Sequence, residues 1–347
     1  MKKMMKVATF VAMVLAAGFV SCQEKIPGYL IVDGTTLTGY TDGMPANLVI
    51  PKGITKIADG AFVGCERLES VTIPGSVKTI GEDITREMAA KKGMDGKGVF
   101  YRCQSLRDVT IEKGVKVIGT RSFAMCDRLT NVTIPHGVTT IGRCAFLNCV
   151  SLTSVTIPNS ATTIGEGAFF QCTSLTDVTI PNSVTTIGES AFSECKSLTN
   201  VTIPNGVKKI GEYAFSRCES LTSVTIPNSV KIIGEGAFSN CDFTNVTIPN
   251  SVKTIGKGAF SGCESLTSVI IPNSVTEIGD DAFDECESLK SVQYGGTKKQ
   301  WEAIDGDEYD SNLPGGMIIS CTDGDIRVKT SAEIYEETAP TLRRLSR

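Results

Sequence analysis

Apolar residues recur in this chain with a fixed spacing, and the pattern within one unit predicts two short strands and a tight corner. In one unit the apolar positions are Leu175, Val178, Ile180, Val184, Ile187, Ala191, Phe192 and Cys195. The segment Leu-x-x-Val-x-Ile alternates as a half-buried strand does. Pro181-Asn182 ends that strand, because proline donates no backbone hydrogen bond and asparagine favours turns. Residues 184–187 predict a second short strand, and Gly-x-x-Ala-Phe-x-x-Cys has the spacing of a single helical or 3-10 turn.

The corner phenylalanine marks successive copies of this unit. It occurs at Phe123, Phe146, Phe169, Phe192, Phe215, Phe238, Phe260 and Phe283, with Phe62 and Phe100 before them. The spacing is 23 residues except for 38 after Phe62 and 22 after Phe238. A fixed period of this length is typical of solenoids, in which each coil buries its apolar face only against its neighbours. We therefore expect a right-handed repeat solenoid of about ten 23-residue coils with parallel main strands, short second strands and helical or 3-10 corners, capped at both ends.

The segments around the repeats predict the two caps. The sequence divides into an N-terminal cap at 26–47, a repeat solenoid at 48–292 with an insertion at 82–97, a C-terminal cap at 293–329 and a flexible tail at 330–347. Asp33-Gly34 and Asp323-Gly324 are hairpin signals in the two caps. A short helix around Trp301 could cover the last coil, as the open end of a solenoid requires.

The first residues have the features of an export signal. A basic stretch precedes an apolar run at 7–20, which suits a secretion signal and is too short to span a bilayer. The sequence Phe-Val-Ser-Cys resembles a bacterial lipoprotein signal, so we expect a signal peptide at 1–21 and a lipidated Cys22 as the first mature residue. Phe19 fits that signal loosely, which leaves ordinary cleavage and secretion as the alternative. The expected location is the cell surface or the outer membrane, with membrane contact through the lipid anchor only.

The repeat itself resembles a known family. The pattern LxxVxIPxSVxxIGxxAFxxC is similar to the BspA-like, or treponemal-type, leucine-rich repeat over residues 48–292. This resemblance implies a secreted or surface-attached protein of anaerobic bacteria or some protozoa, acting in adhesion to matrix proteins or between cells. It implies an extracellular protein or glycan as the partner. A structural or self-associating surface component is the alternative function.

Most cysteines occupy one column of the repeat. Of the 13 cysteines, ten share this column: Cys65, Cys103, Cys126, Cys149, Cys172, Cys195, Cys218, Cys241, Cys263 and Cys286. Because they occur singly, one to a coil, we expect a reduced packing ladder rather than disulfides or zinc sites. Cys144 and Cys321 lie outside the column and are expected to be the more reactive thiols.

The remaining chemistry does not indicate an enzyme. The net charge of −4 gives no reason to expect nucleic acid as a partner. His136 is the sole histidine and sits in a turn, no nucleophile has a base beside it, and the glycines do not form a phosphate loop. A column of glutamates could offer calcium ligands, although solvated carboxylates are the simpler interpretation. We expect no catalytic residue, no cofactor and no bound metal.

One edge of the first coils differs from the rest and is our candidate partner site. The residues proposed for it are Tyr101, Arg102, Arg121, Arg143, Leu147 and Phe170. In later coils the position after the corner phenylalanine holds serine instead. Two interpretations stay open, because the insertion could cover this apolar and basic edge or could form the recognition surface with it. The threonine-rich main strands could provide broad contact or only favour strand formation.

Overall fold

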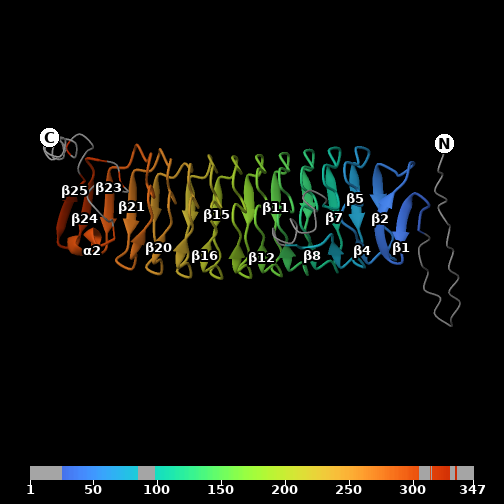
Figure 1. The fold of residues 1–347 in the computed structure, drawn as a ribbon, viewed down its shortest axis with the longest axis horizontal. Coiled ribbons are helices and arrows are strands. Elements are labelled where there is room, and N and C mark those ends of the chain that lie inside the picture. Colours follow the sequence, from blue (N-terminus) through green and yellow to red (C-terminus); the bar gives the residue numbers. More distant parts are fainter. Residues whose placement is uncertain (1–25, 85–97, 305–312, 314, 329–332, 334–347) are drawn as a thin grey trace, which may run out of the picture.

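The chain folds into one elongated stack of coils, with the N-terminal and C-terminal caps at opposite ends (Figure 1). This computed structural model describes residues 26–84, 98–304, 313, 315–328 and 333. The predicted signal peptide with Cys22, most of the insertion, and the tail apart from residue 333 lie outside the described residues. The predicted solenoid is confirmed, with parallel strands repeating at the spacing of the sequence repeat.

Each coil contributes one main strand and one second strand, as the apolar pattern predicts. The main strands are β3 (Asn47–Val49), β5 (Ser70–Ile73), β7 (Asp108–Ile111), β9 (Asn131–Thr133), β11 (Ser154–Thr156), β13 (Asp177–Thr179), β15 (Asn200–Thr202), β17 (Ser223–Thr225), β19 (Asn245–Thr247), β21 (Ser268–Ile271) and β23 (Ser291–Tyr294). The second strands are β4 (Lys56–Ile57), β6 (Thr79–Ile80), β8 (Val117–Ile118), β10 (Thr140–Ile141), β12 (Thr163–Ile164), β14 (Thr186–Ile187), β16 (Lys209–Ile210), β18 (Ile232–Ile233), β20 (Thr254–Ile255) and β22 (Glu277–Ile278).

Equivalent residues of neighbouring coils stand opposite each other. Val155 pairs with Val178, and Thr156 pairs with Thr179. The valine side chains point into the core, whereas the threonine side chains are exposed. A slip of one residue would exchange these two faces, so the alternation fixes the register.

Antiparallel hairpins cap both ends. β1 (Leu30–Asp33) and β2 (Thr36–Tyr40) form the N-terminal hairpin, and β2 adds to the sheet of second strands through β4. At the other end, β24 (Ile318–Cys321) and β25 (Gly324–Arg327) extend the main strands beyond β23. The helix α2 (Lys298–Glu302) begins with a capping box at Thr297 and buries Trp301 edge-on against Tyr294.

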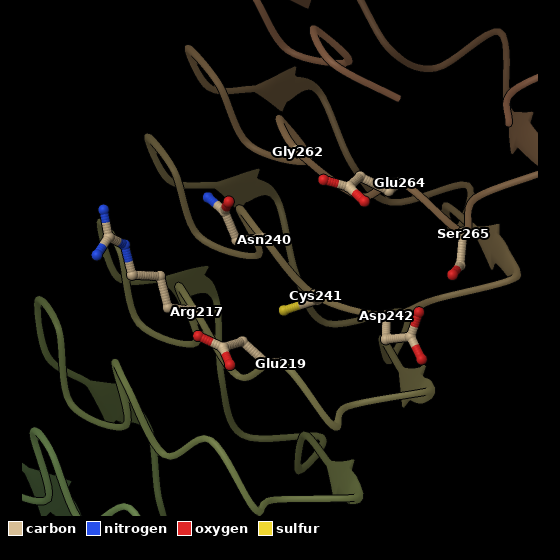
Figure 2. A pocket seen from close by; sticks show the side chains of 8 residues that line it. All are labelled: Arg217, Glu219, Asn240, Cys241, Asp242, Gly262, Glu264 and Ser265. Carbon is tan, nitrogen blue, oxygen red and sulfur yellow. The ribbon is translucent and has the colours of Figure 1, made fainter. Parts of the chain in front are cut away.

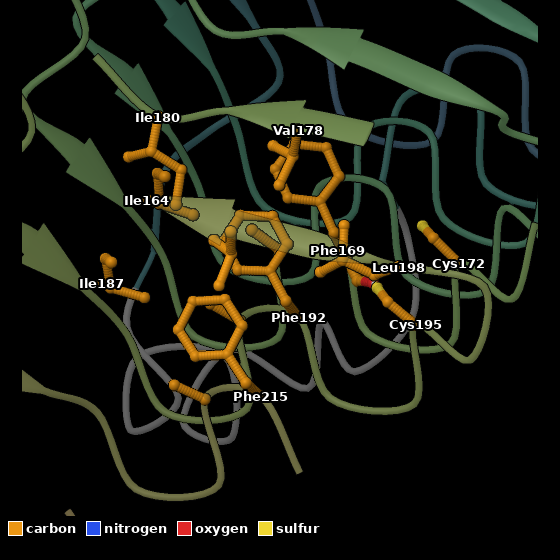
Figure 3. Packing of buried hydrophobic residues seen from close by; sticks show 14 of the residues in the cluster. Ile164, Phe169, Cys172, Val178, Ile180, Ile187, Phe192, Cys195, Leu198 and Phe215 are labelled. Carbon is orange, nitrogen blue, oxygen red and sulfur yellow. The ribbon is translucent and has the colours of Figure 1, made fainter. Parts of the chain in front are cut away.

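The core is a continuous aromatic stack. Consecutive corner phenylalanines lie with ring centroids 5.0 to 5.5 Å apart and planes within 15° of parallel, and Tyr40 begins the stack on Phe62 at 5.6 Å. Figure 3 shows Phe169, Phe192 and Phe215 in successive coils. All the corner phenylalanines are fully buried. A single coil has no second layer to bury its ring, so the stack forms only when coils associate.

The predicted helical or 3-10 corner is wrong. In the described coils the corner is a series of turns with two left-handed residues, for example Ser190 at φ 53° and Glu194 at φ 59°. The amide groups of these two residues donate to Glu212 O and Ser216 O of the next coil, each at 2.8 Å. A left-handed residue takes the chain out of a helical path, and alternate amides then face the neighbouring coil. The corners therefore form a third ladder of hydrogen bonds between coils.

The main strands do not form one uninterrupted sheet. The second strands continue through a twelve-stranded sheet, whereas the main strands divide into an eight-stranded sheet ending at β17 and a five-stranded sheet beginning at β19. The division falls at the 22-residue unit, where Cys241-Asp242-Phe243 is one residue shorter than Cys-x-x-Leu in the other coils. Phe243 occupies the position that leucine holds in the other coils, and it is fully buried.

Candidate functional site

The residues after the corner phenylalanines stand in one column along the corner ladder, with the fully buried Ala124 between Tyr101 and Leu147. Gly64 N donates to Tyr101 O at 2.8 Å, and Asn148 N donates to Phe170 O at 2.7 Å, so the corner ladder holds these coils side by side. Tyr101, Leu147 and Phe170 are half-buried, and Val63 in the same column is exposed. We call these four side chains, together with Arg102, the corner patch.

Arg102 is the cation of the corner patch that reaches solvent. Its guanidinium lies 5.3 Å from the ring centroid of the adjacent Tyr101, within the range of a cation–π contact. Its backbone is left-handed, with φ 60°, because it occupies the second left-handed position of its corner. An exposed arginine stacked on a tyrosine combines the two side chains that most often dominate interface energetics.

Arg121 and Arg143 are engaged in contacts within the protein. Arg143 Nε donates to Glu166 Oε1 at 3.2 Å, and only 14% of its side chain is exposed. Arg121 is half-buried and contacts the Cys144 thiol. These two arginines support the edge of the solenoid, so they offer a partner much less surface than Arg102 does.

The first residues of the insertion run along the edge of the second strands. Thr120 Oγ1 donates to Ile84 O at 3.1 Å, and Thr120 N donates to Glu82 O at 2.8 Å. A Cβ atom at Gly142 would lie only 2.7 Å from Asp83 Oδ1, so this glycine allows the insertion to reach a second coil. Burial raises the pKa of Asp83, although a backbone hydrogen bond from Arg143 lowers it in part. Residues 82–84 therefore do not cover the corner patch, and the rest of the insertion lies outside the described residues.

The cysteine column is a hydrogen-bonded ladder of free thiols. Each thiol after Cys65 donates to the carbonyl of the phenylalanine in the preceding coil, at 3.0 to 3.3 Å; Cys195 Sγ, for example, donates to Phe169 O (Figure 3). The reduced ladder that the spacing predicts is confirmed among the described residues. Burial raises the pKa of the column thiols from Cys103 to Cys286, to about 12 for Cys172 and Cys218.

One cysteine differs from its prediction. Cys144 was expected to be reactive because it lies outside the column, but it is buried, and burial raises its pKa despite the nearby Arg143 and Arg121. Cys321 is partly exposed, and its pKa is also raised, mainly by burial.

The described residues contain no constellation that holds a metal. No group of three or more His, Cys, Asp or Glu side chains converges in the part of the chain that the structure describes. The glutamate column forms separate pairs instead: Glu166 with Arg143, Glu212 with Lys209, and Glu235 with the Tyr213 hydroxyl. The last contact and burial raise the pKa of Tyr213 to about 12. No described helix is both long enough and apolar enough to cross a bilayer.

Two hollows of the surface lie near the shortened coil, which sequence reasoning did not identify as a site. Figure 2 shows one of about 380 Å³, lined by side chains of successive corners that include Arg217, Asn240 and Asp242. A second, of about 610 Å³, lies where the main strands β15, β17 and β19 meet the Pro-Asn turns. The missing residue after Cys241 was the signal that could have located both.

Comparison with known proteins identifies the family. Residues 44–91, 96–218 and 185–303 match the sequence profile of the BspA type leucine rich repeat region, in six copies. The chain belongs to this family. The resemblance predicted from the LxxVxIPxSVxxIGxxAFxxC pattern is thus confirmed for this BspA-type protein.

Solved structures with the same repeat include several bacterial proteins. A leucine-rich repeat protein from Bacteroides ovatus ATCC 8483 is 30% identical over 79% of this chain and 69% of its own length, with a TM-score of 0.65. A leucine rich cell surface protein from Faecalibacterium prausnitzii A2-165 is 27% identical over 84% of this chain and 98% of its own, with a TM-score of 0.38. No curated protein matches the chain. The fold is that of a repeat scaffold, which suits protein interaction in general.

Proposed function

We propose that this BspA-type protein is an exported binding scaffold of the bacterial cell surface, anchored through a lipid on Cys22, which adheres to an extracellular protein or glycan. The observation that supports it most directly is the corner patch, where half-buried aromatic and aliphatic side chains and Arg102 interrupt an otherwise serine-rich column. An exposed apolar patch bordered by polar residues is typical of a protein interaction site. The protein has no catalytic role in this proposal.

The corner patch can be tested with matched variants of the mature chain. We expect Tyr101→Ser with Phe170→Ser to weaken adhesion of chain-coated beads to immobilised extracellular matrix proteins by at least tenfold, because the aromatic anchors are lost. Arg217→Ser is the control, since Arg217 occupies the column of Arg102 in a later coil. Unchanged adhesion with an unchanged thermal melt would place the partner site elsewhere. Assembly of the chain alone in sedimentation would favour the self-associating alternative.

The anchor has its own test. Cells expressing the full chain are grown with an alkyne analogue of palmitate, and the protein is isolated and checked for label. We expect labelled protein in the membrane fraction and neither label nor membrane attachment for Cys22→Ser. Label-free protein in the medium would show secretion without an anchor.

A further inference from the structure

The division of the main sheet leaves a seam in which backbone groups have no partner. β17 and β19 lie side by side, yet no backbone hydrogen bond joins them, although both strands are fully described. On either side the ladder is intact: Ile203 N donates to Thr225 O, and Ile248 N donates to Ile270 O. The corresponding amide of Ile226 donates to no main-chain carbonyl among the described residues, as is also the case for Ile157 and Ile180; the seam differs from those coils because its two strands share no backbone hydrogen bond at all. Unpaired main-chain donors and acceptors require water or a ligand.

The seam is open to the surface. Val224 is partly exposed, whereas Val201 and Val246, its equivalents in the adjacent coils, are each only 4% exposed. Val224, Thr225, Ile226 and Thr247 of the two separated strands all line the 610 Å³ hollow. A ligand in this hollow can therefore reach the unpaired backbone groups.

The hollow continues into a groove. A neighbouring hollow of about 470 Å³ shares Ile180, Asn182 and Thr202 with it. One wall is the row of threonines Thr179, Thr202, Thr225 and Thr247, and the other is the row of asparagines Asn159, Asn182, Asn205 and Asn228. At about 4.8 Å for each coil, five coils give a groove about 20 Å long. We call it the seam groove.

The chemistry of the seam groove is neutral and rich in hydrogen-bonding groups. Asp177 is the one charged residue among those lining the two hollows, and isoleucine and proline form the apolar part. Threonine hydroxyls and asparagine amides each both donate and accept, and the seam adds main-chain groups of both kinds. An anionic ligand would find no counter-charge here, and a cationic ligand would find only Asp177. The ligand that fits best is therefore one whose groups also both donate and accept hydrogen bonds.

We propose that the seam groove binds a neutral, hydroxyl-rich glycan chain. Sugar hydroxyls donate and accept equally, so they match the mixed groups of the walls and of the seam. An extended peptide fits less well, because β17 and β19 remain neighbours and leave no room for an added strand between them. The proposal deepens the proposed role as a binding scaffold and uses a different face from the corner patch. The proposed glycan site lies beside the unit in which the repeat is one residue shorter.

The test uses the mature chain and three soluble neutral polysaccharides: a β-1,3-glucan, a β-1,4-glucan and an α-mannan. Hydrogen exchange of the free protein should be fast at the amides of residues 224–226 and 245–247 and slow in the paired strands β13 and β21. We expect one polysaccharide to slow exchange in the seam and to retard the protein in affinity gel electrophoresis. Failure of all three to do so would overturn the proposal.

Variants locate the site. We expect Thr202→Val with Thr225→Val to weaken polysaccharide binding by about tenfold, because two hydroxyl contacts are removed from exposed strand positions. Thr110→Val with Thr133→Val is the matched control in the same column outside the groove, and it should bind as the wild type does. Equal loss in both pairs would contradict a site at the seam groove.

Restoring the missing residue tests the seam itself. Insertion of serine between Asp242 and Phe243 should rejoin β17 with β19, slow their amide exchange and weaken polysaccharide binding. Retained binding after the sheet has closed would overturn the role of the seam. The two proposals fail in different ways. Adhesion to protein that depends on the corner patch, without any polysaccharide binding, would overturn only the glycan site. Polysaccharide binding at the seam groove, with adhesion unchanged in the corner-patch variants, would overturn only the corner patch.

Discussion

Two residues in most described corners adopt a left-handed backbone, and their side chains show how the coil tolerates sequence variation. Glycine occupies some of these positions, such as Gly167 and Gly262, but Ser190, Glu194 and Arg217 occupy others. A residue with a Cβ atom is strained there, by about 1 kcal/mol. In corners that are followed by another corner, the amide of such a residue donates to a carbonyl of the next coil, as Glu194 N does to Ser216 O, and this contact keeps the strained conformation.

This strain leads to a prediction at one residue. Ser190→Gly should leave the free energy of unfolding unchanged or raise it by up to about 0.5 kcal/mol, because the relief of strain at φ 53° offsets the freedom that glycine adds to the unfolded chain. Ser193→Gly in the same corner is the control and should lower it, since Ser193 is not left-handed and glycine only adds freedom to the unfolded chain. Urea unfolding of both variants gives the measurement. Equal changes in the two would contradict the explanation.

At the scale of the element, the thiol ladder connects the corner of each coil to the one before it. A phenylalanine carbonyl accepts both the amide of its own cysteine and the thiol of the next coil, as Phe169 O does from Cys172 N and Cys195 Sγ. The sulfur thus fills a small apolar site and also satisfies a buried acceptor. Neither role requires a second sulfur, which agrees with the free thiols of the described column.

Removing one thiol should therefore cost more than its volume suggests. We expect Cys195→Ala to lower the free energy of unfolding by about 1–3 kcal/mol, from a lost hydrogen bond and a small cavity. Cys321→Ala, at a partly exposed position outside the column, should change it by less than about 0.5 kcal/mol. Chemical unfolding under reducing conditions measures both. A neutral Cys195→Ala variant would show that the thiol contacts contribute nothing net.

At the scale of the whole molecule, stacking repeats one buried thiol in coil after coil, and the solenoid should consequently be sensitive to alkali. The ordinary pKa of the thiol is 9.0, and burial raises the pKa of Cys172 and Cys218 in the folded chain to about 12. Between these values the unfolded chain releases protons that the folded chain keeps. The contribution to stability is complete below pH 9 and is lost as the pH rises from 9 towards 12.

The measurement is urea unfolding at pH 8, 9 and 10 in the presence of a reductant. Each titrating thiol should reduce the free energy of unfolding by up to about 1.4 kcal/mol per pH unit above pH 9. Cys172→Ser should make the loss of stability with pH shallower by the contribution of one thiol, because serine does not titrate in this range. A stability that stays flat from pH 8 to pH 10 would be incompatible with thiols buried as described.

Most of the fold could be predicted from the sequence, because every coil repeats the same local pattern. The strand positions around Val178 and Ile187, the phenylalanine stack and the free thiol column follow from periodicity and residue type. The corner could not be predicted in this way. Its i, i+3 spacing suits a helix. Hydrogen bonds to the next coil favour left-handed residues instead, and local sequence patterns carry no information about contacts with a coil that lies a full repeat away.

The candidate site could also be predicted from the sequence only in part. The sequence placed Tyr101, Leu147 and Phe170 in one column, and the structure keeps them together. It could not show that Arg143 is buried against Glu166, since this pairing depends on how adjacent coils and the insertion pack. Periodicity alone therefore determined a stack of parallel strands with an aromatic and thiol core, because identical coils can bury their apolar faces only on one another. Only the tertiary structure decided that one missing residue divides the main sheet, because hydrogen bonding between β17 and β19 depends on their separation in space.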